Sequence, residues 1–185
     1  MSSPFLQPSA TELRARLVHA DAEVRRIAVM ELPYSDEDDI LPLLVAACAD
    51  SDPRVRADAA RALEGFEEPE AVAALLPLLR DGDEGTRRAA ADTLSELKDD
   101  RHGPALLAWA SDPDPFVRAA VFRALRALRV AESLAPALAA LEHPDARVRR
   151  EATGVLGYLR DASALGALTR VATNDPDPEV RRVTV

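Results

Sequence analysis

The sequence of 185 residues contains few cysteines and few aromatic side chains. Cys48 is the single cysteine, so no disulfide can form within the chain, and nothing indicates an oxidising compartment. Aromatic residues make up 4% of the chain and hydrophobic residues 48%, which favours close packing of alanine and leucine. No apolar run has membrane-spanning length and no signal peptide is recognisable, so the sequence predicts a cytoplasmic protein with no membrane contact.

Motifs that support catalysis or metal binding are also missing. His19, His102 and His143 fall in predicted turns or at helix starts, and the chain has no Cys-x-x-Cys or His-x-x-x-His spacing. It has neither a nucleophile elbow nor a glycine-rich phosphate loop. The sequence therefore predicts no catalytic residue, no metal site and no cofactor, and indicates a protein that is not an enzyme.

A short pattern recurs along the chain: an Asp, two further residues, then in most copies an aliphatic residue followed by Arg. Four intervals between copies are 31 residues and the last is 32. A period of this length is the signature of a helical repeat protein. The copies begin at Asp21, Asp52, Asp83, Asp114, Asp145 and Asp177.

Each repeat is predicted to contain two helices. The recurring Asp is a good N-cap, and Pro follows it at Pro53, Pro115 and Pro178, where a missing N–H costs nothing. Small apolar residues stand four positions after the aliphatic residue and leucines eight positions after it, which places both on one helix face. The leucines are Leu32, Leu63, Leu94, Leu125 and Leu156. A charged turn and a second apolar stretch then complete each repeat.

The two ends of the chain carry separate expectations. Residues 1–8 have no periodicity and are expected to be flexible, while Ser9 and Glu12 form a capping box that opens a first helix. Residues 9–185 are predicted to form one repeat domain. The sixth repeat stops two turns into its first helix, so Val180, Val183 and Val185 would lie uncovered. We expect further repeats or another chain to cover them.

The repeat resembles the short bacterial HEAT repeat of the phycobilisome-lyase-like type. Residues 50–63 and 111–125 carry the resemblance most clearly, and it extends over about residues 20–185. It implies an all-α fold, a right-handed α-α superhelix of about five two-helix repeats plus a truncated sixth. It also implies that the recurring Asp and Arg side chains bond between neighbouring repeats and to the turn backbone. The His-Glu pairs of HEAT-like di-iron hydroxylases are missing here.

Charge is unevenly distributed. Residues 1–100 have a net charge of −11 and residues 101–185 a net charge of +2. The excess acidic residues fall in predicted turns along one edge, which is either a solvated rim or a surface that attracts a basic partner. Because the whole chain has a net charge of −9, nucleic-acid binding is disfavoured. This acidic edge comprises Asp36, Glu37, Asp38, Asp39, Glu67, Glu68, Glu70, Asp99 and Asp100.

The second helices are expected to line the concave side of the repeat array. Their positions outside the predicted core are mostly apolar, and Trp109 is the only tryptophan in the chain. A groove of this kind would accept a helix or an extended peptide. Alternatively, neighbouring helices pack on one another and hide these side chains. The predicted groove residues are Leu43, Ala47, Leu78, Trp109, Ala140 and Val171.

Three functions therefore remain open. The first is a non-catalytic scaffold or adaptor that binds a protein partner in its concave groove. The second, which follows from the family resemblance, is an accessory subunit of a bilin-chromophore lyase-like complex. The third is nucleic-acid binding, which the net charge disfavours.

Overall fold

The computed structural model describes residues 9–36 and 38–184. Within these ranges the chain forms twelve α-helices and four 3-10 helices and contains no strand, which confirms the all-helical prediction. The predicted flexible segment 1–8 lies outside the described residues. The α-helices are α1 (Ala10–Leu17), α2 (Ala22–Glu31), α3 (Ile40–Ala47), α4 (Pro53–Ala62), α5 (Pro69–Leu78), α6 (Glu84–Ser95), α7 (Gly103–Leu107), α8 (Pro115–Leu128), α9 (Leu134–Ala140), α10 (Ala146–Leu159), α11 (Leu165–Asn174) and α12 (Pro178–Val183). The 3-10 helices are η1 (Leu32–Tyr34), η2 (Asp100–His102), η3 (Ala131–Ser133) and η4 (Ala162–Ala164).

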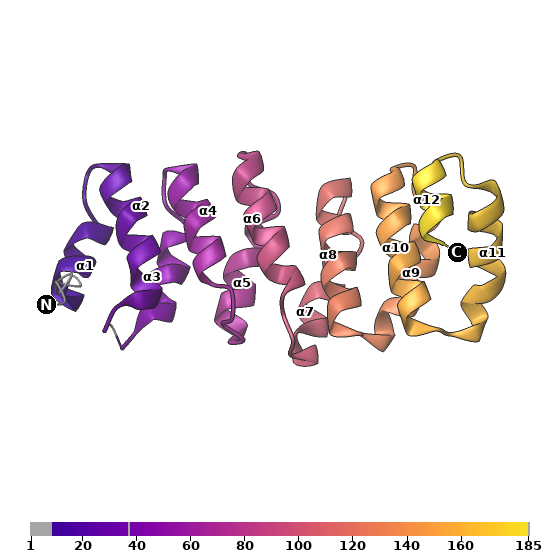
Figure 1. The fold of residues 1–185 in the computed structure, drawn as a ribbon, viewed down its shortest axis with the longest axis horizontal. Coiled ribbons are helices and arrows are strands. Elements are labelled where there is room, and N and C mark those ends of the chain that lie inside the picture. The colour runs from indigo at the N-terminus through magenta and orange to yellow at the C-terminus, as the bar shows by residue number, and fades with distance from the viewer. Residues whose placement is uncertain (1–8, 37, 185) are drawn as a thin grey trace, which may run out of the picture. The chain divides into compact units, whose positions relative to one another are not determined.

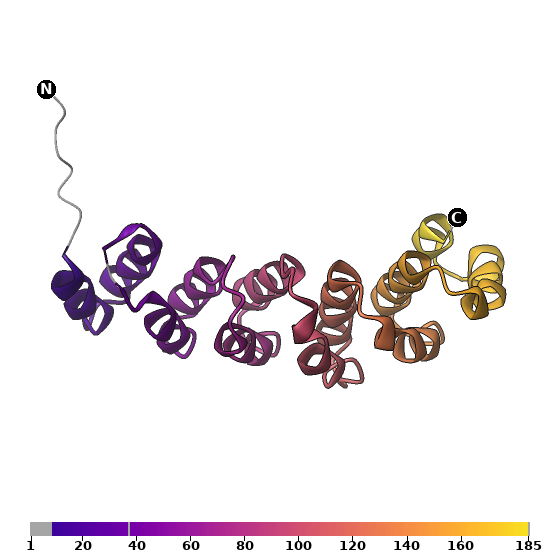
Figure 2. The same ribbon diagram turned by 90° about the horizontal axis from the view of Figure 1, so that it is seen from below.

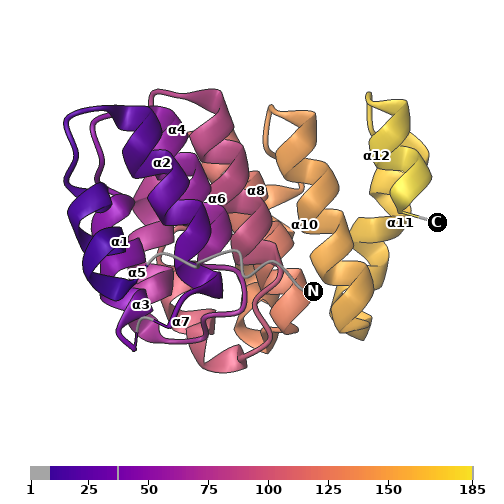
Figure 3. The same cartoon turned by 60° about the vertical axis from the view of Figure 1, so that its left-hand side comes forward.

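The chain divides into two compact units, an N-terminal unit of residues 1–93 and a C-terminal unit of residues 94–185. In the N-terminal unit, α2 and α4 lie side by side in one layer, and α1, α3 and α5 form a second layer (Figures 1 and 2). Figure 3 shows the same first layer continuing into α6. In the C-terminal unit, α8, α10 and α12 form one layer, and α7, α9 and α11 form the other (Figure 1).

The recurring aspartates begin the first helix of each repeat as predicted. Asp21, Asp52, Asp114, Asp145 and Asp177 are N-caps whose carboxylates accept a hydrogen bond from a backbone N–H of the first turn. Asp83 accepts from the backbone N–H of Thr86 at 2.8 Å. Each carboxylate thus satisfies a donor that has no partner inside its helix.

The core follows the predicted apolar face of the first helices. Leu32, Leu63, Leu94, Leu125 and Leu156 are fully buried, and so are the small residues four positions before them. Cys48 is also buried, and this burial raises the pKa of its thiol to about 12. None of the described helices combines the length and the hydrophobicity that crossing a bilayer requires.

Candidate partner-binding cavities

Bidentate Arg–Asp ion pairs join consecutive repeats within each unit. In the N-terminal unit, the Nε and Nη2 groups of Arg25 donate to the two carboxylate oxygens of Asp50 at 2.7 and 2.8 Å. Arg56 binds Asp81 in the same way at 2.7 Å for both bonds. In the C-terminal unit, both bonds from Arg149 to Asp175 measure 2.8 Å. Hydrogen bonding to these guanidinium groups lowers the pKa of Asp50, Asp81 and Asp175 below the usual range.

The same arginines hold the turn that precedes their own helix. The Nη1 group of Arg149 donates to the carbonyl oxygens of His143 and Pro144 at 2.9 and 3.0 Å. Asp175 in turn accepts from the backbone N–H of Asp177 at 2.9 Å. The implied structural role of the recurring Arg is therefore confirmed for Arg25, Arg56 and Arg149. Its carboxylate partner, however, lies two residues before the N-cap of the next repeat, a position that sequence reasoning did not single out.

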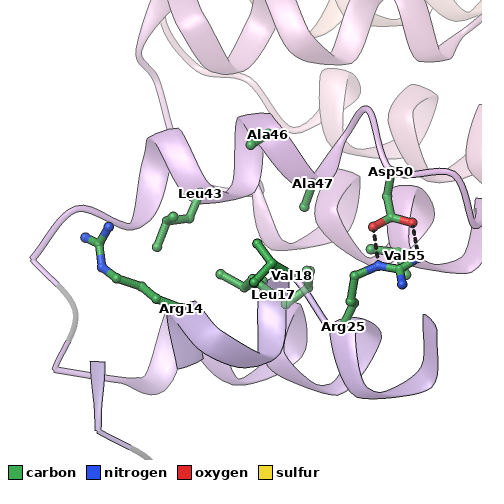
Figure 4. A pocket seen from close by; sticks show the side chains of 10 residues that line it. Arg14, Leu17, Val18, Arg25, Leu43, Ala46, Ala47, Asp50 and Val55 are labelled. Atoms are coloured by element: carbon green, nitrogen blue, oxygen red, sulfur yellow. Dashed lines mark hydrogen bonds and ion pairs between the residues drawn. The ribbon is translucent and has the colours of Figure 1, made fainter. Parts of the chain in front are cut away.

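A cavity of about 340 Å³ lies between α1, α2 and α3 in the N-terminal unit. Figure 4 shows Leu43 and Ala47 on α3 above Leu17 and Val18 at the end of α1. Val18 is 82% exposed, which is a large exposure for an aliphatic side chain. The lining residues are Arg14, Leu17, Val18, Arg25, Val29, Leu43, Ala46, Ala47, Asp50 and Val55.

The cavity has charged residues at both ends and a mainly apolar wall. The Arg25–Asp50 ion pair lies at one end, and Arg14 lies at the other (Figure 4). The guanidinium of Arg25 is occupied, since its Nη1 group also donates to the carbonyl oxygens of His19 and Ala20. With the pair already satisfied, the surface open to a ligand is that of the aliphatic side chains. Such a site suits an apolar side chain of a partner.

The six predicted groove residues do not share one environment. Leu43 and Ala47 are half-buried and line the cavity of the N-terminal unit. Trp109 is half-buried and lies beyond the end of α7, in the turn that follows it. Leu78 and Ala140 are buried, with 6% and 2% of their surface exposed, so they offer little surface to a partner. Val171 is 7% exposed and lines a cavity of the C-terminal unit. A partner-binding role for these six residues stays a prediction.

The predicted acidic edge divides between the two units. Asp36, Asp38 and Asp39 are exposed in the turn before α3, and Glu37 lies outside the described residues. Glu67 is half-buried, and Glu68 and Glu70 are exposed where α5 begins. In the C-terminal unit Asp100 is exposed, whereas Asp99 binds Arg101, and this hydrogen bonding lowers the pKa of Asp99 to about 2. A role of this edge in attracting a partner is not tested by the structure and stays a prediction.

The net charge of the protein belongs to its N-terminal unit. Residues 1–93 contain 19 acidic and 10 basic side chains, which gives −9, whereas residues 94–185 contain 13 of each. The N-terminal cavity therefore lies in an acidic unit.

Among the described residues, no group of three or more His, Cys, Asp or Glu side chains is placed to hold a metal ion.

Tandem helix pairs joined by Arg–Asp pairs define an α-helical repeat protein. The model of HEAT repeats matches residues 10–95, 55–126, 72–142 and 134–185. Because these matches together extend over nearly the whole chain, the protein belongs to the HEAT-repeat family. No curated protein matches the chain.

Several solved structures are similar to this chain. The complex of CpcE and CpcF of phycocyanin lyase from Nostoc sp. PCC7120 is 26% identical over all of this chain and 77% of that one, with a TM-score of 0.59. An archaeal HEAT-like repeats protein from Thermococcus onnurineus NA1 is 16% identical over 94% of this chain and 83% of that one, with a TM-score of 0.68. A designed armadillo repeat protein in complex with the peptide (KR)4 is 18% identical over 93% of this chain and 95% of that one, with a TM-score of 0.58.

Proposed function

We propose that the protein is a non-catalytic scaffold that binds a segment of a protein partner through the cavity between α1 and α3. The observation that carries this proposal is the cavity itself, whose mouth leaves Val18 82% exposed beside the half-buried Leu43. Covering these side chains with an apolar group of a partner removes their surface from water. Fully burying a leucine or a similar side chain in this way contributes about 1.5–3 kcal/mol to the free energy of binding.

The charge of the N-terminal unit adds a second requirement for the partner. A net charge of −9 raises the local concentration of basic segments and speeds their association. The partner segment is therefore an extended or helical peptide with an apolar anchor and basic flanking residues. A designed armadillo repeat protein of similar fold was solved with the basic peptide (KR)4, which supports this kind of ligand.

The test is selection from a displayed library of random peptides on the immobilised full-length chain. The selected peptides should combine an apolar residue with Lys or Arg. They should bind the Leu43→Gln/Ala46→Gln double variant about tenfold more weakly, because polar groups then line the cavity. Ala73→Gln is the matched control, since Ala73 is also an exposed alanine on a second helix but lines neither cavity described here. Equal affinity for the double variant, or peptides without an apolar residue, would contradict the proposal.

A second candidate function rests on the similarity to the phycocyanin lyase complex. In this alternative the chain is an accessory subunit that handles an open-chain tetrapyrrole together with a partner subunit. The cavity volume of about 340 Å³ is at the small end of the range of about 300–1,000 Å³ for small-molecule sites. Titration with an open-chain tetrapyrrole should shift its absorption spectrum if this alternative holds, and an unchanged spectrum counts against direct binding.

A further inference from the structure

The C-terminal unit contains a second cavity, of about 350 Å³, at the same place in the repeat as the first. Its lining residues Leu141, Arg149 and Val171 each follow Leu17, Arg25 and Ala47 by 124 residues, which is four repeats of 31. Both cavities are lined by the bidentate Arg–Asp pair that joins two repeats. The backbone of the repeat thus forms one type of cavity twice.

At two positions the second cavity has a charged side chain where the first has an apolar one. Where the N-terminal cavity has Val18, the C-terminal cavity has Glu142, and where the first has Ala46, the second has Arg170. Arg170 donates a hydrogen bond to Glu142 at 3.2 Å. Both side chains are exposed, at 61% and 77%, and an exposed ion pair of this kind contributes little to stability. A ligand can therefore replace one of its members at little cost.

Arg170 and His143 both offer hydrogen-bond donors at this cavity. Arg149 and Asp175 are already bonded to each other and to backbone groups. Arg170 uses one of its donors. The Nδ1 atom of His143 accepts from the backbone N–H of Asp145, so in the neutral imidazole the other ring nitrogen carries the proton. Guanidinium and imidazole donors together match a carboxylate.

We propose that the C-terminal cavity binds a carboxylate of the partner. The residues that decide which group each cavity binds are Val18 and Ala46 in the N-terminal cavity and Glu142 and Arg170 in the C-terminal cavity. This inference rests on the proposed function and extends it. The N-terminal cavity selects an apolar side chain, and the C-terminal cavity selects a carboxylate that takes the place of Glu142 at Arg170. The carboxylate comes from an acidic side chain or from a chain terminus.

The test uses nuclear magnetic resonance of the ¹⁵N-labelled full-length chain with three capped amino acids as probes. The α-amide of N-acetyl-glutamate offers a side-chain carboxylate, and N-acetyl-glycine offers a terminal one. The neutral analogue N-acetyl-glutaminamide controls for shape. The carboxylate that binds should shift the amide signals of residues 141–143 and 170–175, with an affinity about tenfold higher than that of the neutral analogue.

Variants then test the specificity positions. Glu142→Val/Arg170→Ala should lose the carboxylate response and gain a response of the same amide signals to N-acetyl-leucinamide. Glu179→Val/Arg182→Ala is the matched control, since it removes an exposed ion pair of α12 that lines neither cavity. Equal response to the glutamine analogue, or an unchanged carboxylate response in the Glu142/Arg170 variant, would overturn the inference. If N-acetyl-leucinamide does not perturb Val18 and Ala47 in the unmodified chain, the proposed function itself fails.

Discussion

Arg149 and Asp175, 26 residues apart in sequence, are joined by two parallel hydrogen bonds of 2.8 Å each. Their side chains are only 9% and 4% exposed. Replacing Asp175 by Asn leaves a buried guanidinium without its counter-charge, so we expect a loss of about 3 kcal/mol in the free energy of unfolding. Urea denaturation measures this loss.

The exposed pair of Arg182 and Glu179 provides the control for this experiment. Its side chains are 72% and 59% exposed, so Glu179→Gln should change the unfolding free energy by less than about 1 kcal/mol. Similar losses in the two variants would show that the Arg149–Asp175 pair does not hold the repeats together.

Acid should unfold the protein within a defined pH range. Hydrogen bonding to Arg147 lowers the pKa of Asp145 from its ordinary value of 3.8 to about 2, and hydrogen bonding to Arg149 lowers that of Asp175. A carboxylate whose pKa is lower in the folded state stabilises the fold fully above its unfolded pKa. That stabilisation is lost as the pH falls through the folded pKa.

The dependence of stability on these groups should therefore be concentrated between about pH 4 and pH 2. Urea midpoints measured from pH 7 to pH 2 will show it. In the Asp175→Asn variant the decline between these values should be shallower, because one titrating group is gone. An equally steep decline in that variant would assign the acid sensitivity to other carboxylates.

His143 occupies the position where most other repeats have the aspartate of the ion pair. Its Nδ1 atom accepts from the backbone N–H of Asp145 at 3.1 Å, just as Asp175 accepts from Asp177. Among the residues that the structure describes, no carboxylate pairs with Arg118, and its Nε group donates to the carbonyl oxygen of Ala110 at 3.3 Å. His143→Asp should supply the missing partner and raise the unfolding free energy by about 1 kcal/mol.

His19→Asp is the matched control for His143→Asp. His19 accepts the same backbone hydrogen bond, from Asp21 at 3.0 Å, but it lies in the N-terminal unit, whereas Arg118 lies in the C-terminal unit. The melting temperature should therefore rise for His143→Asp only. A rise in both variants would show that the aspartate stabilises the turn itself and not a pair with Arg118.

A glycine at the start of α7 lies close to the following repeat's turn. A Cβ atom at Gly103 would lie 2.9 and 3.1 Å from the two methyl groups of Val130. Gly103→Ala should thus destabilise the fold by about 1–3 kcal/mol through overpacking. Gly157 is inside α10 with open space around it, so Gly157→Ala should stabilise the fold by up to about 1 kcal/mol. Calorimetry of both variants measures whether their unfolding free energies change in opposite directions.

The first helices could be predicted from sequence because their signals are local. An Asp that caps a helix and a leucine eleven residues later act within one helix, and Asp52 and Leu63 are placed as expected. The carboxylate partners of Arg25 and Arg149 were missed although Asp50 and Asp175 show the same spacing before the caps Asp52 and Asp177. That pairing is formed between repeats, and spacing within one repeat does not reveal it.

The cavities could be predicted only in part. Leu43, Ala47 and Val171 were selected by helical spacing, and each of them lines a cavity. Val18 was not selected, because it follows the last residue of α1 and belongs to no periodic face. Burial of Leu78 and Ala140 depends on how closely neighbouring elements approach, which helical periodicity does not determine.

The fifth repeat is one residue longer than the others, and the structure shows where the extra residue is accommodated. Asp175, Asp177 and Arg181 keep the spacing of Asp50, Asp52 and Arg56, so the added residue falls before Asp175, toward the end of α11. The turn that carries the Arg149–Asp175 pair thus keeps its spacing, and the end of the second helix is the segment whose length varies. A chain organised in this way tolerates insertions and deletions at the ends of its second helices, where the shape of a binding surface changes while the connection between repeats is preserved.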